Sequence, residues 1–253
     1  MYPPDLPKPE WLGAYARRFD TVELNNSFYR LPSAAQFARW QDLVPPNFQF
    51  AVKASRYLTH FKRLTQPEEP IERLLSRAAH LGPTLGPILY QLPPNWVPDL
   101  QRFKEFLERL PARLPGLRQP LRHVIEFRDL RGYAAPYLSL MEQHDVSLCV
   151  HDMPESASPR LILGSGVYVR LHGYDAKYGG SYPDHVLTDW ASWLADARAA
   201  GRMGWVYFNN DAHGHAVKNA ERLRELLSLP RSQVHSFAGS QVLGGAFDLG
   251  TRE

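Results

Sequence analysis

The sequence predicts an α/β protein that folds as a TIM-like (β/α) barrel lacking the usual first strand. Segments with helical periodicity alternate with strand-like segments along nearly the whole chain of 253 residues. Several of the strands are short apolar runs separated by helices, which is typical of a parallel sheet covered on both faces. Polar residues recur at the C-terminal ends of these strands, where barrel enzymes hold their active sites.

The chain begins on a helix. Trp11, Tyr15 and Phe19 recur at three-to-four spacing before the first strand, and Asp99 is placed to cap a later helix. Helices are predicted over residues 11–19, 37–43, 71–81, 100–110, 133–144, 187–197 and 216–227. Strands are predicted over residues 21–25, 48–53, 85–91, 123–127, 146–151, 167–171 and 205–208.

Seven strands are one fewer than a (β/α)₈ barrel needs, and the missing one would precede the first helix. The prediction is therefore a barrel whose first strand is absent or supplied otherwise. The alternative is an open doubly wound sheet, but no G-x-G-x-x-G follows any strand. We expect one barrel domain over residues 1–229 and a flexible C-terminal tail over residues 230–253, which are aperiodic.

The composition excludes several classes of protein. Hydrophobic residues make up 44% and charged residues 22% of the chain, which is globular and not disordered or collagen-like. The net charge of +3 is too small to diagnose nucleic-acid binding. A single cysteine, Cys149, excludes an intrachain disulfide and a multi-cysteine metal cluster, and we expect it to be an inert core residue. No apolar run approaches the ~20 residues of a membrane span and no secretory signal is visible, so we expect a cytoplasmic protein without a membrane partner.

The polar residues at the strand ends fall on alternate positions. Because side chains alternate faces along a strand, such residues can share the inner face of a barrel. The residues that do so at their strands are Glu23, Asn25, Lys53, Glu126, Arg128, Arg170, His172, Asn209 and Asp211, and Asp152 lies at the end of a further strand. So many charges at one end exceed what packing requires, which predicts a binding or catalytic site at the C-terminal mouth.

These residue types suit acid–base chemistry. Glu23, Glu126 and Asp152 could supply a general acid and base, with His172 as a further candidate near neutral pH. Lys53 could carry a proton or stabilise charge. The alternative is that Lys53 and the arginines only neutralise the carboxylates.

Substrate binding is expected from neighbouring positions. Arg128 and Arg170 could clamp an anionic group, with Asn25 and Asn209 beside them. Loops 173–181 and 209–215 follow the last two strands, where barrels often bind phosphate, and they include Tyr178, Asn210 and Asp211. Loop aromatics at the mouth could stack a sugar or a base or could merely cover the barrel; they are Tyr29, Tyr57, Tyr174, Tyr178 and Tyr182.

A divalent metal is a further hypothesis with little support. Glu126, Asp152, His172 and Asp211 could form an oxygen-rich site for Mg or Mn. The sequence has no H-E-x-x-H motif, and His213 and His215 read as exposed loop residues.

Six segments of the chain resemble the YecE-like family, which is number 72 among the domains of unknown function. They are FDTVELNNSFYRLPS (19–33), FAVKASRYLTH (50–60), LGPILYQLPPNW (85–96), IEFRD (125–129), YVRLHG (168–173) and YFNNDAHGHAVKNA (207–220). The resemblance implies a TIM-barrel-like fold related to sugar-isomerase-like barrels, and it supplies no established reaction. Family members open with a strand of the type GTSGWSYxxW, which is missing here and would be the eighth strand.

Three functions from different classes remain. The first is an isomerase- or hydrolase-like enzyme that uses acid–base chemistry on a small polar, phosphorylated or sugar-like substrate. The second is a nucleic-acid-binding or phosphodiester-cleaving barrel that contacts phosphates through Lys53, Arg56, Arg128 and Arg170, whose affinity would fall steeply with salt. The third is a barrel that binds a ligand without turnover. The modest net charge favours the first.

Overall fold

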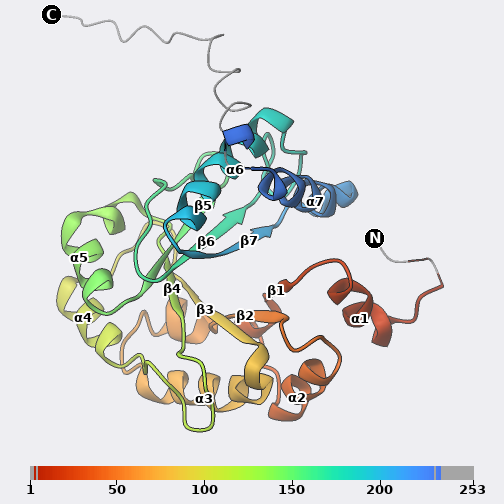
Figure 1. Cartoon of the computed structure of the whole chain (residues 1–253). Coiled ribbons are helices and arrows are strands. Elements are labelled where there is room, and N and C mark those ends of the chain that lie inside the picture. The colour runs from red at the N-terminus through yellow and green to blue at the C-terminus, as the bar shows by residue number, and fades with distance from the viewer. Residues whose placement is uncertain (1–2, 4, 231, 235–253) are drawn as a thin grey trace, which may run out of the picture.

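The computed structural model describes residues 3, 5–230 and 232–234 of the chain. Its centre is a nearly closed barrel of seven parallel strands in sequential order, surrounded by helices (Figure 1). The strands are β1 (Thr21–Leu24), β2 (Gln49–Lys53), β3 (Leu85–Gln91), β4 (His123–Glu126), β5 (Ser147–Asp152), β6 (Gly166–Leu171) and β7 (Met203–Phe208). The predicted fold class and all seven predicted strands are confirmed, with ends that move by one to two residues in most cases.

Seven α-helices are present in the described part of the chain. They are α1 (Trp11–Ala16), α2 (Ala34–Asp42), α3 (Glu68–Ala78), α4 (Leu100–Glu108), α5 (Ala135–Gln143), α6 (Asp184–Ala199) and α7 (His215–Ser228). The predicted cap of α4 is confirmed, since the Asp99 side chain accepts a hydrogen bond from the Arg102 amide at 2.9 Å. None of the helices within the described ranges is long and apolar enough to cross a membrane.

The strands pack on two sides. Their outward side chains form one apolar layer with α2–α5 and a second with α6 and α7. Their inward side chains fill the lower barrel; these are Ala51, Leu89, Val124, Cys149, Tyr168, Trp205 and Tyr207. Cys149 is fully buried there, and burial raises the pKa of its thiol well above the usual value.

The sheet ladder begins at β1 and ends at β7, and the two strands meet through side chains. Thr21 Oγ1 and Tyr207 Oη are 2.7 Å apart, while the ladder hydrogen bonds of the described strands run only between sequential neighbours. Outside the barrel wall, Arg18 of the segment after α1 pairs with Glu221 of α7 at 2.5 Å. The seam between β1 and β7 is thus bridged inside and outside but not by backbone pairing.

Most of the expected C-terminal tail lies outside the described residues. Within them, Val234 is fully buried against the layer that contains α6 and α7, so the packed part of the chain reaches this residue.

Candidate functional site

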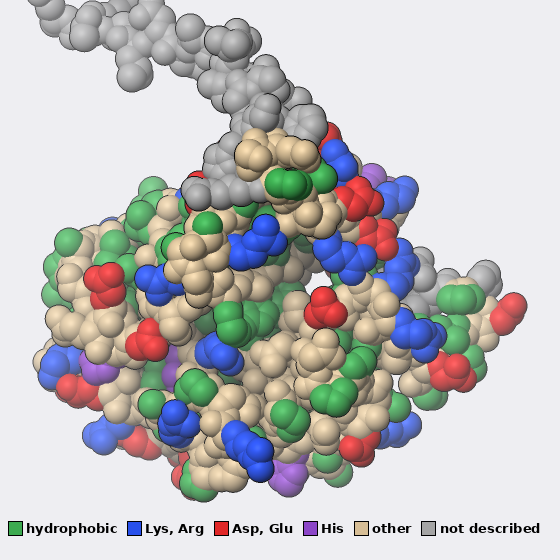
Figure 2. All heavy atoms as spheres, in the orientation of Figure 1, with side chains coloured by type: hydrophobic (Ala, Val, Ile, Leu, Met, Phe, Trp, Pro, Cys, Tyr) green, Lys and Arg blue, Asp and Glu red, His purple; other side chains and the backbone are tan. Residues whose placement is uncertain are grey.

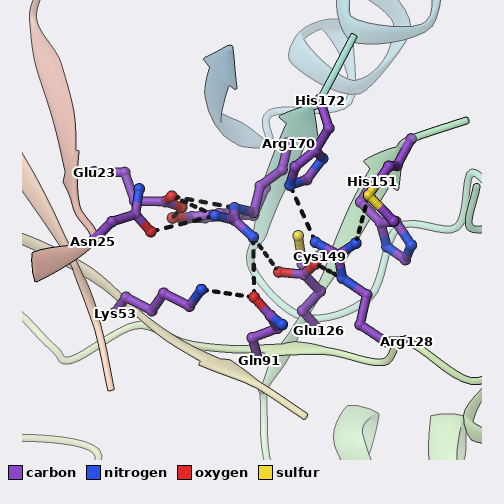
Figure 3. Close-up of polar contacts among 12 residues, drawn as sticks. Glu23, Asn25, Lys53, Gln91, Glu126, Arg128, Cys149, His151, Arg170 and His172 are labelled. Carbon is purple, nitrogen blue, oxygen red and sulfur yellow. Dashed lines mark hydrogen bonds and ion pairs between the residues drawn. The ribbon is translucent and has the colours of Figure 1, made fainter. Parts of the chain in front are cut away.

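The C-terminal mouth of the barrel holds a cluster of polar side chains, one from almost every strand. Strand alternation places Glu23, Lys53, Gln91, Glu126, His151 and Arg170 above the apolar floor of the barrel (Figure 3). All six are the last or next-to-last residues of their strands. The structure therefore brings together most of the residues that the strand ends predicted.

Arg170 is the centre of this cluster. Its guanidinium donates to Glu23 Oε1 from Nε at 3.2 Å and from Nη2 at 2.8 Å, and to Glu126 Oε2 from Nη1 at 2.8 Å (Figure 3). Weaker contacts at 3.4 Å reach the side-chain oxygens of Gln91 and Asn25. Every nitrogen of this buried guanidinium is thus occupied by a protein acceptor.

Both carboxylates of the cluster are committed to arginine. Burial alone would raise the pKa of Glu126, but the charges of Arg170 and Arg128 hold it well below its usual range. Arg128 Nε forms an ion pair with Glu126 Oε1. The other Glu23 oxygen, Oε2, accepts a hydrogen bond from the Tyr168 hydroxyl at 2.5 Å. Glu126 therefore stays ionised and cannot donate a proton near neutral pH.

His172 lies next to Arg128 as a neutral imidazole. Arg128 Nη2 is 3.1 Å from His172 Nε2, and because a guanidinium can only donate, Nε2 accepts and the ring proton sits on Nδ1. Burial and the charge of Arg170 lower the pKa of His172 to about 3. Nδ1 is buried, and its proton has no acceptor among the described residues.

His151 is a second neutral histidine of the mouth. Burial is the main cause that lowers its pKa, to about 4, and its ring lies 6.4 Å from that of His172. Its Nδ1 is also buried without a partner in the described part of the chain.

Lys53 differs from the two arginines because no ion pair within the described ranges includes it. Its Nζ donates to Gln91 Oε1 at 2.7 Å (Figure 3). The same Nζ lies 4.2 Å from the centre of the Phe28 ring. Burial and the nearby charge of Arg170 lower its pKa from 10.5 to about 8. Lys53 is thus a buried amine that exists in both protonation states close to physiological pH.

The cluster contains one more positively charged side chain than it has carboxylates. Lys53, Arg128 and Arg170 face two carboxylates, Glu23 and Glu126, and the histidines are neutral. Because a buried charge is costly without a partner, this surplus favours binding of an anion at the mouth.

The structure does not bring Asp152 into this cluster. Asp152 lies on the outward face of β5, where burial raises its pKa and its neighbours are Arg160, Tyr182 and Trp190. The inward residue at the end of β5 is its neighbour His151. Within the described residues, no group of three or more His, Cys, Asp or Glu side chains is arranged to hold a metal ion, so the proposed metal set is not assembled.

The predicted binding residues after β6 and β7 have different surroundings. Asn210 is fully buried and links the loop after β6 to α7, because its Nδ2 donates to Gly180 O at 2.8 Å and to Asn219 Oδ1 at 2.9 Å. Tyr178 sits at the mouth with a left-handed backbone (φ 61°), and its ring lies 5.7 Å from that of His172. Tyr29 is 69% exposed at the rim.

A cleft of about 460 Å³ opens at the seam between β1 and β7. Glu23, Asn25, Asn209 and Asp211 line its upper end, and the buried Nδ2 of Asn209 has no hydrogen-bond partner in the described part of the chain. Figure 2 shows the surface hollowed near the middle of this face, below the half that carries α6 and α7. The cleft connects the polar mouth with solvent.

Four residues of the mouth were missed by the sequence interpretation: Gln91, His151, Tyr168 and His60. Leu89 and Cys149 lie on the inner face of their strands, so alternation along the strand places Gln91 and His151 on the same face. Both side chains are uncharged and were not among the predicted site residues. Tyr168 is on the inner face of β6, two residues before Arg170. His60 belongs to a π-helical turn that apolar periodicity does not reveal, and burial together with the charges of Lys53 and Arg56 lowers its pKa.

The chain is similar to curated proteins and to solved structures. The chain is 26% identical over 263 residues to the UPF0759 protein YunF of Bacillus subtilis, covering 92% of each protein. It is 30% identical over 117 residues to the UPF0759 protein YecE of Escherichia coli, covering 43% of each. Among solved structures, a DUF72 family protein from Thermotoga maritima superposes with a TM-score of 0.75 at 24% identity, covering 90% of this chain and 93% of that one.

A DUF72 family protein from Enterococcus faecalis superposes with a TM-score of 0.70 at 23% identity, covering 87% of this chain and 94% of that one. At these identities the two structures support the fold alone. The family described as "Protein of unknown function DUF72" matches residues 1–241, nearly the whole chain. This protein is therefore a member of the DUF72 family, also named UPF0759, for which no reaction is established.

Proposed function

We propose that this barrel is an enzyme in which Lys53 moves a proton on a small, anionic, sugar-like substrate bound at the C-terminal mouth. The observation that carries the proposal is the state of Lys53: it is buried, has no carboxylate partner among the described residues, and has a pKa of about 8. An acid–base group works best when its pKa is close to the pH of the reaction.

Each protonation state of Lys53 has a use. The neutral amine can take a proton from a substrate hydroxyl, or from a carbon beside a carbonyl group, and the ammonium ion formed can return it. The ammonium ion also stabilises the negative charge that develops on the substrate oxygen. Gln91 Oε1, at 2.7 Å, holds the amine in place and accepts a hydrogen bond in either state.

The carboxylates have a supporting role in this proposal. Glu23 and Glu126 hold Arg170 by three hydrogen bonds, and with its contacts to Gln91 and Asn25 this guanidinium has no N–H left for a substrate. Within the described part of the chain, His172 Nδ1 and Asn209 Nδ2 are donors without partners, and these could bind substrate oxygens. The surplus positive charge supports an anionic substrate over a neutral one.

The proposal is tested by following the protonation of Lys53 directly. Reductive methylation with ¹³C-formaldehyde labels the lysines for NMR, and the signal absent from Lys53→Met identifies Lys53. We expect this signal to titrate near pH 8 and its midpoint to rise when sulfate, an anion of constant charge, is added. Lys218→Met, which removes an exposed lysine of α7, should leave the signal unchanged. A midpoint that does not respond to sulfate would contradict anion binding beside Lys53.

Turnover provides the second test. Small phosphorylated and carboxylated sugars are screened for isomerisation or hydrolysis, and the activity is compared between the natural chain and Lys53→Met. Loss of a general acid–base group lowers turnover by about 10²–10⁴-fold. Turnover that survives in Lys53→Met would show that another group moves the proton.

A further inference from the structure

One sector of the rim concentrates positive charge. Residues 24–67 run from the last residue of β1 through α2 and β2 to the residue before α3, and they carry six Lys and Arg but a single acidic residue, Asp42. The whole protein has a net charge of only +3, so the rest of the chain is slightly acidic and the excess lies in this sector. None of the ion pairs within the described ranges includes Arg56, Lys62 or Arg63.

Exposed aromatic rings lie between these cations. Tyr29 is 69%, Phe61 67% and Tyr57 42% exposed, although burial of such rings is favourable. The Arg56 guanidinium lies 5.3 Å from the Tyr29 ring centre and 5.4 Å from that of Phe61, so it is in cation–π range of both rings. The Lys62 amine lies 5.7 Å from the Tyr57 ring.

The alternation continues into the next loop. Arg63 lies 5.6 Å from the ring of Trp96, which follows β3. Cations and rings thus alternate across the loops that follow β1, β2 and β3. We call this strip the aromatic rim: Tyr29, Arg56, Tyr57, Phe61, Lys62, Arg63 and Trp96.

The backbone of the aromatic rim is unusual. Residues Tyr57–Phe61 form a π-helical turn, and Arg63 (φ 47°) and Leu64 (φ 65°) are left-handed although neither is glycine. Such conformations cost free energy and concentrate at functional sites. Here they place Phe61 and Arg63 on the outside while Leu58 and Leu64 are buried.

The aromatic rim adjoins the mouth. The Phe28 ring lies 5.1 Å from that of Tyr29 and 5.1 Å from that of His60, and it also covers Lys53 at 4.2 Å. A chain bound along the rim would therefore lie close to the Phe28 ring that covers the buried amine.

We infer that the aromatic rim binds single-stranded nucleic acid. Exposed rings stack on bases of any sequence, and the cations between them neutralise the backbone phosphates. An acidic peptide would use the cations but has no use for three exposed rings, and the bases of a duplex are not open to stacking. Binding at the rim goes beyond the proposed enzymatic function and does not depend on proton transfer by Lys53.

The experiment is fluorescence anisotropy with a labelled single-stranded oligonucleotide of about 12 nucleotides and the full chain. We expect Tyr29→Ala and Phe61→Ala each to raise Kd at least about five-fold, and Tyr29→Phe to bind like the natural chain because the ring is kept. Arg56→Gln should weaken binding and reduce the slope of log Kd against log salt by about 0.7. Lys218→Gln is the matched control, since it removes an exposed cation elsewhere on the surface, and it should leave Kd unchanged.

Several results would overturn the inference. They are absence of binding at about 50 mM salt, equal affinity for a duplex or for polyglutamate, or an unchanged Kd in both ring-deleting variants. Since all the replaced side chains are at the surface, the variants should unfold at the temperature of the natural chain. These results are independent of the Lys53 titration, so failure of one proposal can be told apart from failure of the other.

Discussion

Replacement of Lys53 by methionine should stabilise the protein at pH 7. Keeping a lysine protonated when its pKa has fallen from 10.5 to about 8 costs about 3 kcal/mol. Methionine has a similar length and no charge, so the variant avoids this cost. It loses the hydrogen bond to Gln91 and the contact with the Phe28 ring, which offset part of the gain. We therefore expect a net gain of about 1–2 kcal/mol.

The pH dependence of the difference identifies its cause. The folded-state pKa of Lys53 lies below the unfolded value, so the unfolded chain binds more protons between pH 8 and 10.5. The stability of the natural chain should therefore rise with pH across this window relative to Lys53→Met. The penalty is fully present below pH 8, and the advantage of the variant should shrink between pH 8 and 10.5.

The assay is urea unfolding of both chains from about pH 7 to about pH 10. Lys218→Met removes an exposed lysine of α7 and should change the free energy of unfolding by no more than about 0.5 kcal/mol across the range. The reasoning is refuted if Lys53→Met is less stable than the natural chain at pH 7, since the ammonium group would then be well paired. A difference independent of pH would refute it equally.

Three further predictions concern the surroundings of Lys53. Glu126→Gln removes one of the two carboxylates that pair with buried Arg170 and should lower the free energy of unfolding by about 3–5 kcal/mol. A loss below about 1 kcal/mol would mean that the ion pairs are dispensable. Burial lowers the pKa values of His151 and His172 to about 4 and about 3, so the unfolded chain takes up protons before the folded one and the free energy of unfolding should fall as the pH drops below 6.5. Replacing both histidines by glutamine should flatten this part of the curve of stability against pH. An unchanged curve would argue against neutral histidines in the folded protein. Gly173 has a φ of 118°, and in Gly173→Ala the added Cβ would lie 2.1 and 2.3 Å from two carbonyl oxygens of the following loop. We expect the loop to be displaced and to be cut faster by proteases. Cleavage at the natural rate would show that the loop adapts.

The fold could be predicted because its determinants are local. A strand of this barrel buries both faces, so it reads as a short apolar run, and the helices between carry one apolar stripe. Asp99 is an example, since a carboxylate directly before an apolar helical pattern satisfies the first amides of α4. The turn Tyr57–Phe61 and the left-handed Arg63 and Leu64 have no such pattern, and the sequence interpretation missed them.

The sequence predicted where the candidate site lies, but not which of its side chains pair with one another. Asp152 was favoured because it is charged, yet alternation along β5 turns it outward and turns the uncharged His151 inward. Glu23, Glu126 and Lys53 were grouped as acid–base candidates on equal terms. The structure commits both carboxylates to Arg170 and leaves Lys53 with a neutral amide.

The sequence by itself determined the order of strands and helices, and it determined that polar groups gather at one end of the barrel. Both follow from periodicity, which a single segment expresses without its neighbours. The tertiary structure alone decided which cation of the mouth has no carboxylate partner among the described residues and which aromatic rings stay in water. These properties depend on the burial and distance of residues far apart in the chain, such as Lys53 and Arg170, because desolvation and Coulomb interactions act through space.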